Sequence, residues 1–151
     1  MVSDTVSWNF YGYMTRAEGR TVQEWFDALS EDEQDETRDT IGYLQHVRLD
    51  QWKYPQFEHL GEGLSEIRFR VSSRNLTVRI YGTFWPVGKR FSYTFLLGGN
   101  KKVTNDRLGK KEARRRKGLL EKGESTVHEF KFSNESNSEA KKGKAKAVAI
   151  R

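Results

Sequence analysis

The chain of 151 residues contains no cysteine, which excludes disulfide bonds and thiolate metal sites. Its three histidines, His46, His59 and His128, are far apart and lack the spacing of a metal site. No apolar run approaches the roughly 18 residues that a membrane-spanning helix needs, and the N-terminus has no hydrophobic signal segment. We therefore expect a soluble, cytoplasmic protein that uses no metal and no cofactor.

Hydrophobic residues are also scarce, at 35% of the chain, but the aromatic share of 13% compensates for this. Nine Phe, six Tyr and four Trp can bury a large area per residue, so a compact core is feasible. The length predicts one domain over residues 1–132. Residues 133–151 are dominated by Ser, Asn, Glu, Lys and Ala, and we expect a disordered basic tail there.

Charge is distributed unevenly along the chain. Residues 1–60 contain 12 Asp and Glu against 5 Lys and Arg, a net charge of −7. Residues 61–151 contain 9 acidic and 22 basic residues, a net charge of +13. A basic half that includes strands as well as a tail favours a nucleic-acid partner, although charge that only maintains solubility remains an alternative.

The first half of the chain predicts one strand and two helices before a connector. Thr21 with Glu24, and Ser30 with Glu33, have the spacing of helix-capping boxes. The acidic stretch Glu31–Thr40 has no apolar residue, so we expect it to lie in solvent. The expected elements are a strand at 6–14, helices at 22–29 and 31–47, and a connector at 49–60 that Pro55 keeps from being helical.

The second half predicts three consecutive antiparallel strands and a basic helix. Turn residues at 73–75 and 86–88 separate the strands, and Asn105 or Asp106 can start the helix, which Gly123 would end. The expected elements are strands at 64–72, 76–84 and 90–98, a helix at 107–122, and a short strand at 127–132.

Two of these strands place arginines on a single face. Arg68 and Arg70 alternate with the apolar residues of the first strand, and Arg79 and Tyr81 alternate with those of the second. A rigid pleat that directs several guanidinium groups to one side predicts a surface for phosphate or RNA.

The order of elements and several short motifs resemble the RelE/ParE superfamily of bacterial toxins, and within it the phage-derived, HigB-like branch. The central motif is Leu60–Arg68, which is similar to the signature LG-x-GL-x-ELR of that branch. Other similar segments are 8–11, 22–29, 79–81 and 95–102, together with Ala113 and Arg116. The resemblance implies an α+β, RelE-like fold: an antiparallel sheet with two N-terminal helices packed on one face and a basic C-terminal helix.

The resemblance also implies a function, the ribosome-dependent cleavage of mRNA through the 2′-OH of the RNA, without metal. Its partners would be the ribosome, mRNA and a cognate antitoxin of helix-turn-helix type, with no membrane involved. The implied catalytic residues are Arg68, Arg79, Tyr81, Lys101 and Lys102. The candidate RNA-binding residues are Arg70, Arg74, Lys110, Arg114, Arg115 and Arg116.

Two other functions stay open on the same fold. Leu97 and Gly99 stand where the family has His and Phe, which favours a non-catalytic, phage-derived protein that binds RNA or another protein. A gyrase inhibitor like the ParE branch is the third hypothesis. The GL-x-E-I-R motif and the lysine pair favour the RNA-cleaving branch.

Overall fold

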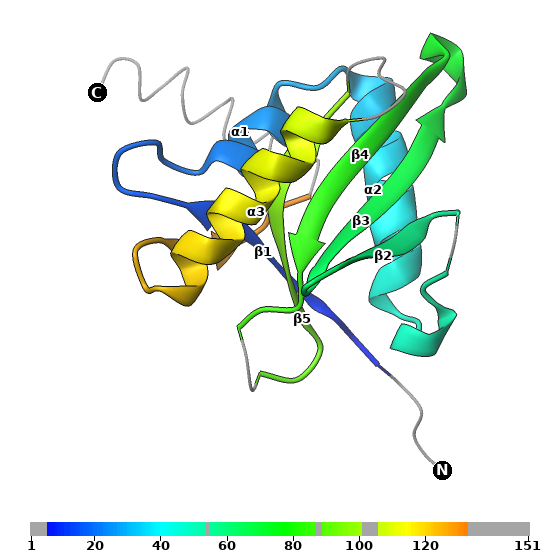
Figure 1. The fold of residues 1–151 in the computed structure, drawn as a ribbon. Helices are drawn as coiled ribbons and strands as arrows, with labels where there is room; N and C mark the ends of the chain where they lie inside the picture. The colour runs from blue at the N-terminus through cyan, green and yellow to red at the C-terminus, as the bar shows by residue number, and fades with distance from the viewer. Residues whose placement is uncertain (1–5, 54, 87–88, 101–105, 133–151) are drawn as a thin grey trace, which may run out of the picture.

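A computed structural model describes residues 6–53, 55–86, 89–100 and 106–132 (Figure 1). Six strands form one sheet, and three α-helices and two short 3-10 helices connect them. In chain order the elements are β1 (Asn9–Met14), α1 (Thr21–Asp27), α2 (Glu31–Gln45), η1 (Leu49–Gln51), β2 (Phe57–Gly61), β3 (Leu64–Val71), η2 (Ser72–Arg74), β4 (Leu76–Thr83), β5 (Ser92–Gly99), α3 (Arg107–Glu121) and β6 (Thr126–Glu129).

The sheet is mixed, with the strand order β2-β3-β4-β5-β1-β6. The expectation of an antiparallel sheet is wrong for one pair, because β1 runs parallel to β5, with Phe10 opposite Tyr93. A parallel pair needs a long crossover, and here α1, α2 and the β2–β4 strands supply it. The expected antiparallel succession of β3, β4 and β5 is confirmed.

The expected connector at 49–60 is wrong, because it holds η1 and an edge strand, β2. Pro55 does prevent a helix, but the residues after it alternate, and buried Phe57 pairs with Ile67 of β3. The β2–β3 turn has positive φ at Gly61, Glu62 and Gly63 (93°, 54° and 81°). Glycine adopts a positive φ without steric cost, so the glycines on both sides of Glu62 lower the strain of this turn.

The helix caps agree with the sequence at α2 and differ from it at α1. Ser30 and Glu33 form the expected capping box. Thr21 is the first residue of α1, whose cap residue is Arg20, so its expected capping role is wrong. The expectation that Glu31–Thr40 lies wholly in solvent is also wrong, because Glu33 and Thr37 are buried.

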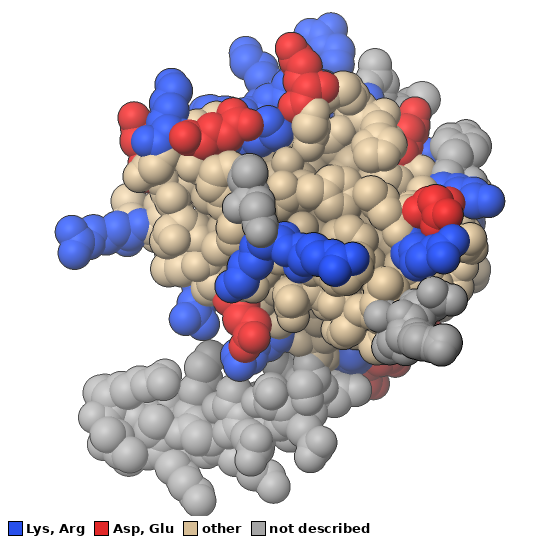
Figure 2. Space-filling view, turned by 90° about the horizontal axis from the view of Figure 1, so that it is seen from below, with Lys and Arg blue, Asp and Glu red and all other residues tan. Residues whose placement is uncertain are grey.

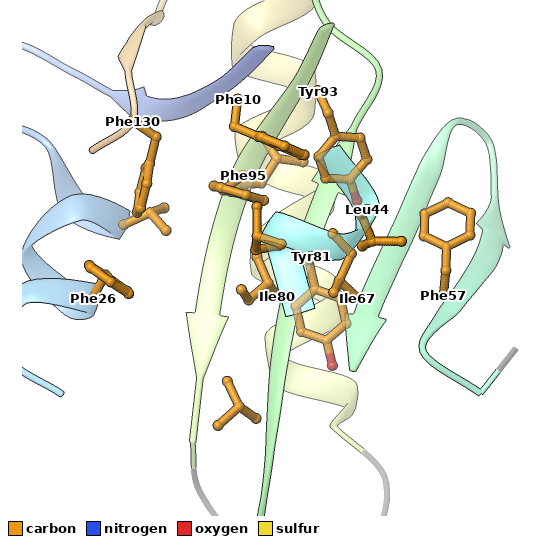
Figure 3. Close-up of a cluster of buried hydrophobic side chains, with 14 of the residues drawn as sticks. Phe10, Phe26, Leu44, Phe57, Ile67, Ile80, Tyr81, Tyr93, Phe95 and Phe130 are labelled. Carbon is orange, nitrogen blue, oxygen red and sulfur yellow. The ribbon is translucent and has the colours of Figure 1, made fainter. Parts of the chain in front are cut away.

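The main core lies between the sheet and the two N-terminal helices. Phe26 of α1 and Leu44 of α2 belong to the same buried cluster as Phe10, Ile80 and Phe95 of the strands (Figure 3). The basic helix α3 lies across the opposite face, in front of the sheet in Figure 1, where it buries Ala113 and Leu120. The sheet is therefore covered on both faces around β4 and β5.

Candidate functional site

The two arginines of the central motif lie side by side on the α3 face of the sheet. Arg68 of β3 is directly opposite Arg79 of β4, and the next pair on this face is Glu66 opposite Tyr81. Antiparallel pairing holds such opposite side chains close together. Alternation along both strands therefore placed Arg68, Arg79 and Tyr81 on one face, as expected from the sequence.

A single buried carboxylate holds both guanidinium groups. Glu66 is 2% exposed, and its Oε1 accepts from Arg68 Nη1 while its Oε2 accepts from Arg79 Nη1, each at 3.0 Å. Arg68 Nη2 also donates to Glu58 Oε1 at 3.3 Å. Because Glu66 uses one oxygen for each arginine, it fixes the separation between the two cationic groups.

Tyr81 is fully buried beneath the start of α3. Its hydroxyl donates to Asp106 Oδ2 at 2.9 Å, and Asp106 Oδ1 accepts from the backbone N–H of Gly109 at the first turn of the helix. Burial, followed by the hydrogen bond to Asp106, raises the pKa of Tyr81 far above its ordinary value. The hydroxyl is therefore a proton donor and not a base at neutral pH.

Lys101 and Lys102 lie outside the described residues, so their expected catalytic role stays a prediction. The residues that flank this segment, Asn100 and Asp106, both line one cleft. Asn100 is held there by its Nδ2, which donates to Glu33 Oε2 of α2 at 3.0 Å.

That cleft has a volume of about 430 Å³ and is lined mainly by apolar atoms. Arg79 is the member of the arginine pair that lines this cleft. Trp25 and Leu108 were not among the candidate site residues of the sequence. The cleft is lined by Trp25, Arg79, Leu97, Gly98, Gly99, Asn100, Asp106, Leu108, Gly109 and Glu112.

The arginines of α3 mainly fasten the helix to the sheet. Arg114 donates to the carbonyl oxygens of Leu60 and Gly61 at 2.9 and 3.2 Å. Arg116 donates to the carbonyl of Leu96 at 2.9 Å and lies 5.1 Å from the ring centroid of Tyr13. These contacts give both arginines a structural role, whatever their part in RNA binding.

Arg115 and Lys110 are placed differently on the same helix. Arg115 is exposed and makes an ion pair with Glu112 at 2.6 Å. Lys110 is half-buried. In the view from below, blue Lys and Arg adjoin red Asp and Glu at the margin of the molecule (Figure 2). Much of the basic charge is thus matched locally, and the RNA-binding role of Lys110, Arg114, Arg115 and Arg116 stays a prediction.

The other two RNA-binding candidates lie at the β3–β4 turn. Arg74 Nε is 3.0 Å from both carboxylate oxygens of Asp32 at the start of α2. Hydrogen bonds from Ser30 and Ser73, and then the ion pair with Arg74, hold the pKa of Asp32 well below its usual range. Arg70 donates to Asn75 Oδ1. The contacts to Asp32 thereby tie the turn to α2.

Comparison of the chain with family models, with curated proteins and with solved structures found no match. Within the described ranges, no three His, Asp or Glu side chains come together as a metal site would require. The helices of that same part of the chain are too short or too polar to cross a bilayer.

Proposed function

We propose that this chain is the toxin of a type II toxin–antitoxin system, and that it cleaves mRNA on the ribosome through the RNA's own 2′-OH. The observation that carries the proposal is the arginine pair, Arg68 and Arg79, held opposite each other by Glu66. A guanidinium group binds two phosphate oxygens at once, so a fixed pair suits a phosphodiester. The resemblance of the central motif to HigB-like toxins supports the same assignment.

The proposed reaction forms no covalent bond between the RNA and the protein. The 2′-oxygen forms a bond to the adjacent phosphorus, the bond from phosphorus to the 5′-oxygen breaks, and a 2′,3′-cyclic phosphate and a 5′-hydroxyl result. Arg68 and Arg79 would stabilise the charge that develops on the phosphorane. Lys101 and Lys102 are our candidates for accepting the proton of the 2′-OH. Tyr81 keeps its proton, but it is buried and bonded to Asp106, so it could donate to the leaving oxygen only after that bond opened.

A second function has an observation in its favour. Glu58 and Glu66 together balance the charges of Arg68 and Arg79, and the hydroxyl of Tyr81 is bonded to Asp106. A non-catalytic protein that binds RNA or a protein partner would need no change in these contacts. The catalytic function requires the exposed Glu58, at 44% side-chain exposure, to give way to a phosphate.

The test is to induce the wild type, Arg68→Ala and Arg79→Ala in a bacterial host and to map the 5′ ends of translated mRNAs by primer extension. Arg48→Ala is the matched control, because Arg48 is an exposed arginine that pairs only with exposed Asp50 among the described residues. Circular dichroism and thermal unfolding of the purified variants separate a lost function from a lost fold.

We expect growth arrest and new cleavage sites with the wild type and Arg48→Ala, and neither with the two site variants. Normal growth and intact mRNA at good wild-type expression would reject the catalytic proposal and favour the binding protein. DNA-damage signalling without RNA cleavage would instead indicate a gyrase inhibitor. A co-purifying helix-turn-helix protein would identify the proposed antitoxin.

A further inference from the structure

We propose that the cleft between Trp25 and Leu108 binds a nucleobase of the RNA strand whose phosphate lies at Arg79. The inference rests on the proposed function in one respect, that the bound nucleic acid is RNA. Its own support is the shape and chemistry of the cleft, which combines an indole, an exposed leucine, an arginine and a polar rim.

The indole of Trp25 lies flat on the backbone of β5. A Cβ built on Gly98 would lie 2.3, 2.4 and 2.5 Å from Trp25 Cε3, Cζ3 and Cδ2. These three atoms belong to the six-membered ring, so this ring covers Gly98 and only glycine permits the approach. One side of the indole is thus supported by the sheet, while the residue as a whole is only half-buried and lines the cleft.

Leu108 forms another part of the wall. It lies in the first turn of α3 and is 79% exposed, the highest value among the large hydrophobic residues of the described chain that are exposed. An isolated exposed leucine needs no explanation, but this one borders a cleft that also holds a half-buried tryptophan. Two apolar groups on the walls of one cleft suit a flat apolar ring, such as a base, between them.

The polar residues of the cleft favour a nucleobase over an apolar protein side chain. Asn100, Asp106 and Glu112 carry hydrogen-bonding groups of the kind that recognise base edges in single-stranded RNA. Arg79 lines the same cleft and belongs to the proposed phosphate site, so a base and its neighbouring phosphate would occupy adjoining positions. The volume, about 430 Å³, lies within the range of roughly 300–1,000 Å³ that is usual for small-ligand sites.

The experiment measures binding without cleavage, in the full-length protein. The probe is the dinucleotide ApA with a 2′-O-methyl group on its first ribose, which removes the nucleophile. Ribose 5-phosphate is the comparison, because it offers the phosphate without a base. Affinities are measured by NMR titration for the wild type, Leu108→Ala, Gly98→Ala and the matched control Leu49→Ala, a leucine that is also exposed, at 43%.

Leu108→Ala changes an exposed side chain, so it keeps the fold, whereas the Gly98→Ala methyl group displaces the indole. Stacking on an aromatic side chain typically changes affinity by roughly 5- to 150-fold per base. We expect Gly98→Ala to weaken dinucleotide binding within that range, Leu108→Ala to weaken it by a few-fold, and Leu49→Ala to leave it unchanged. Binding of ribose 5-phosphate should not change in any of the three.

The outcomes separate this inference from the proposed function. A wild type that binds the dinucleotide in this cleft but never cleaves mRNA would reject the reaction and leave the base site standing. Dinucleotide binding no tighter than that of ribose 5-phosphate, or equal in all variants, would overturn the base site. That result would leave untouched any mRNA cleavage that depends on Arg68.

Discussion

The hydroxyl of Tyr81 donates to the carboxylate of Asp106 at 2.9 Å, and this bond joins the centre of β4 to the start of α3. Asp106 also caps the helix through the N–H of Gly109. The carboxylate of Asp106 therefore links Tyr81 of the proposed site to α3, the helix that covers it.

Tyr81→Phe should lower the free energy of unfolding by about 1.5–3 kcal/mol, the usual value of a hydrogen bond to a charged group. Tyr43→Phe is the matched control, because Tyr43 is 60% exposed and should change stability by less than about 0.5 kcal/mol. Urea unfolding of both variants at pH 7 measures the difference. Equal stabilities for the two variants would show that the Tyr81 hydroxyl does not hold α3.

Glu66→Ala should be strongly destabilising, because it leaves Arg68 and Arg79, with 23% and 16% side-chain exposure, without their shared carboxylate. Removing one partner of a buried ion pair typically costs about 3–5 kcal/mol. Glu58→Ala removes the exposed carboxylate beside Arg68 and should cost less than about 1 kcal/mol. Denaturant unfolding that ranks Glu58→Ala as the more damaging change would contradict the role given to Glu66.

The arginine pair was predictable from the sequence because strict alternation along 64–83 determines which residues share a face. What covers that face was not predictable. Tyr81 was expected on an open surface, but the start of α3 buries it, and no local pattern specifies where a helix packs after an intervening loop. The edge strand β2 was missed because its five residues, although they alternate, are too few to distinguish a short strand from a connector.

The parallel position of β1 and the place of Trp25 were missed for a related reason. A strand that is rich in aromatic residues fits either direction of pairing, and the choice depends on how the chain returns after α1 and α2. Helical spacing groups Trp25 with the apolar face of α1, but spacing alone does not show that this position lies at the end of the core, where the cleft opens.

Gly82→Ala should destabilise the centre of the sheet. A Cβ at Gly82 would lie 2.4 Å from Tyr93 Cε2 and 2.6 Å from the carbonyl oxygen of Thr94, and the backbone atom has little freedom to move away. We expect a loss of about 1–3 kcal/mol, as for other overpacked cores. Thermal unfolding and near-UV circular dichroism, which reports on the packing of Tyr93, provide the measurement.

Gly42→Ala is the matched control for Gly82→Ala. It lies within α2 and a Cβ there would meet no atom within 4 Å. Alanine in a helix interior should raise stability by about 0.5–1 kcal/mol. The two glycine variants should therefore move the unfolding temperature in opposite directions, and a shift in the same direction would show that the packing around Gly82 is not as tight as described.

Glu112 should make stability depend on pH in the acid range. The hydrogen bond from Arg115 has the largest effect on the pKa of Glu112, and partial burial opposes it. With the added hydrogen bond from Arg116, the pKa falls from 4.5 to about 2. Because the folded-state pKa is the lower one, its contribution to stability is present above pH 4.5 and is lost as the pH falls toward 2. Glu112→Gln should therefore make the fall in unfolding free energy between these two pH values less steep.

The ionic strength provides a check on the same carboxylate. Arg115 is exposed, so its attraction to Glu112 should be screened at about 1 M salt, where the Debye length is about 3 Å. The difference in slope between the wild type and Glu112→Gln should shrink accordingly. An NMR titration of the Glu112 carboxyl group gives its pKa directly. A value near 4.5 in the folded protein would refute the ion pairs that Arg115 and Arg116 make with Glu112.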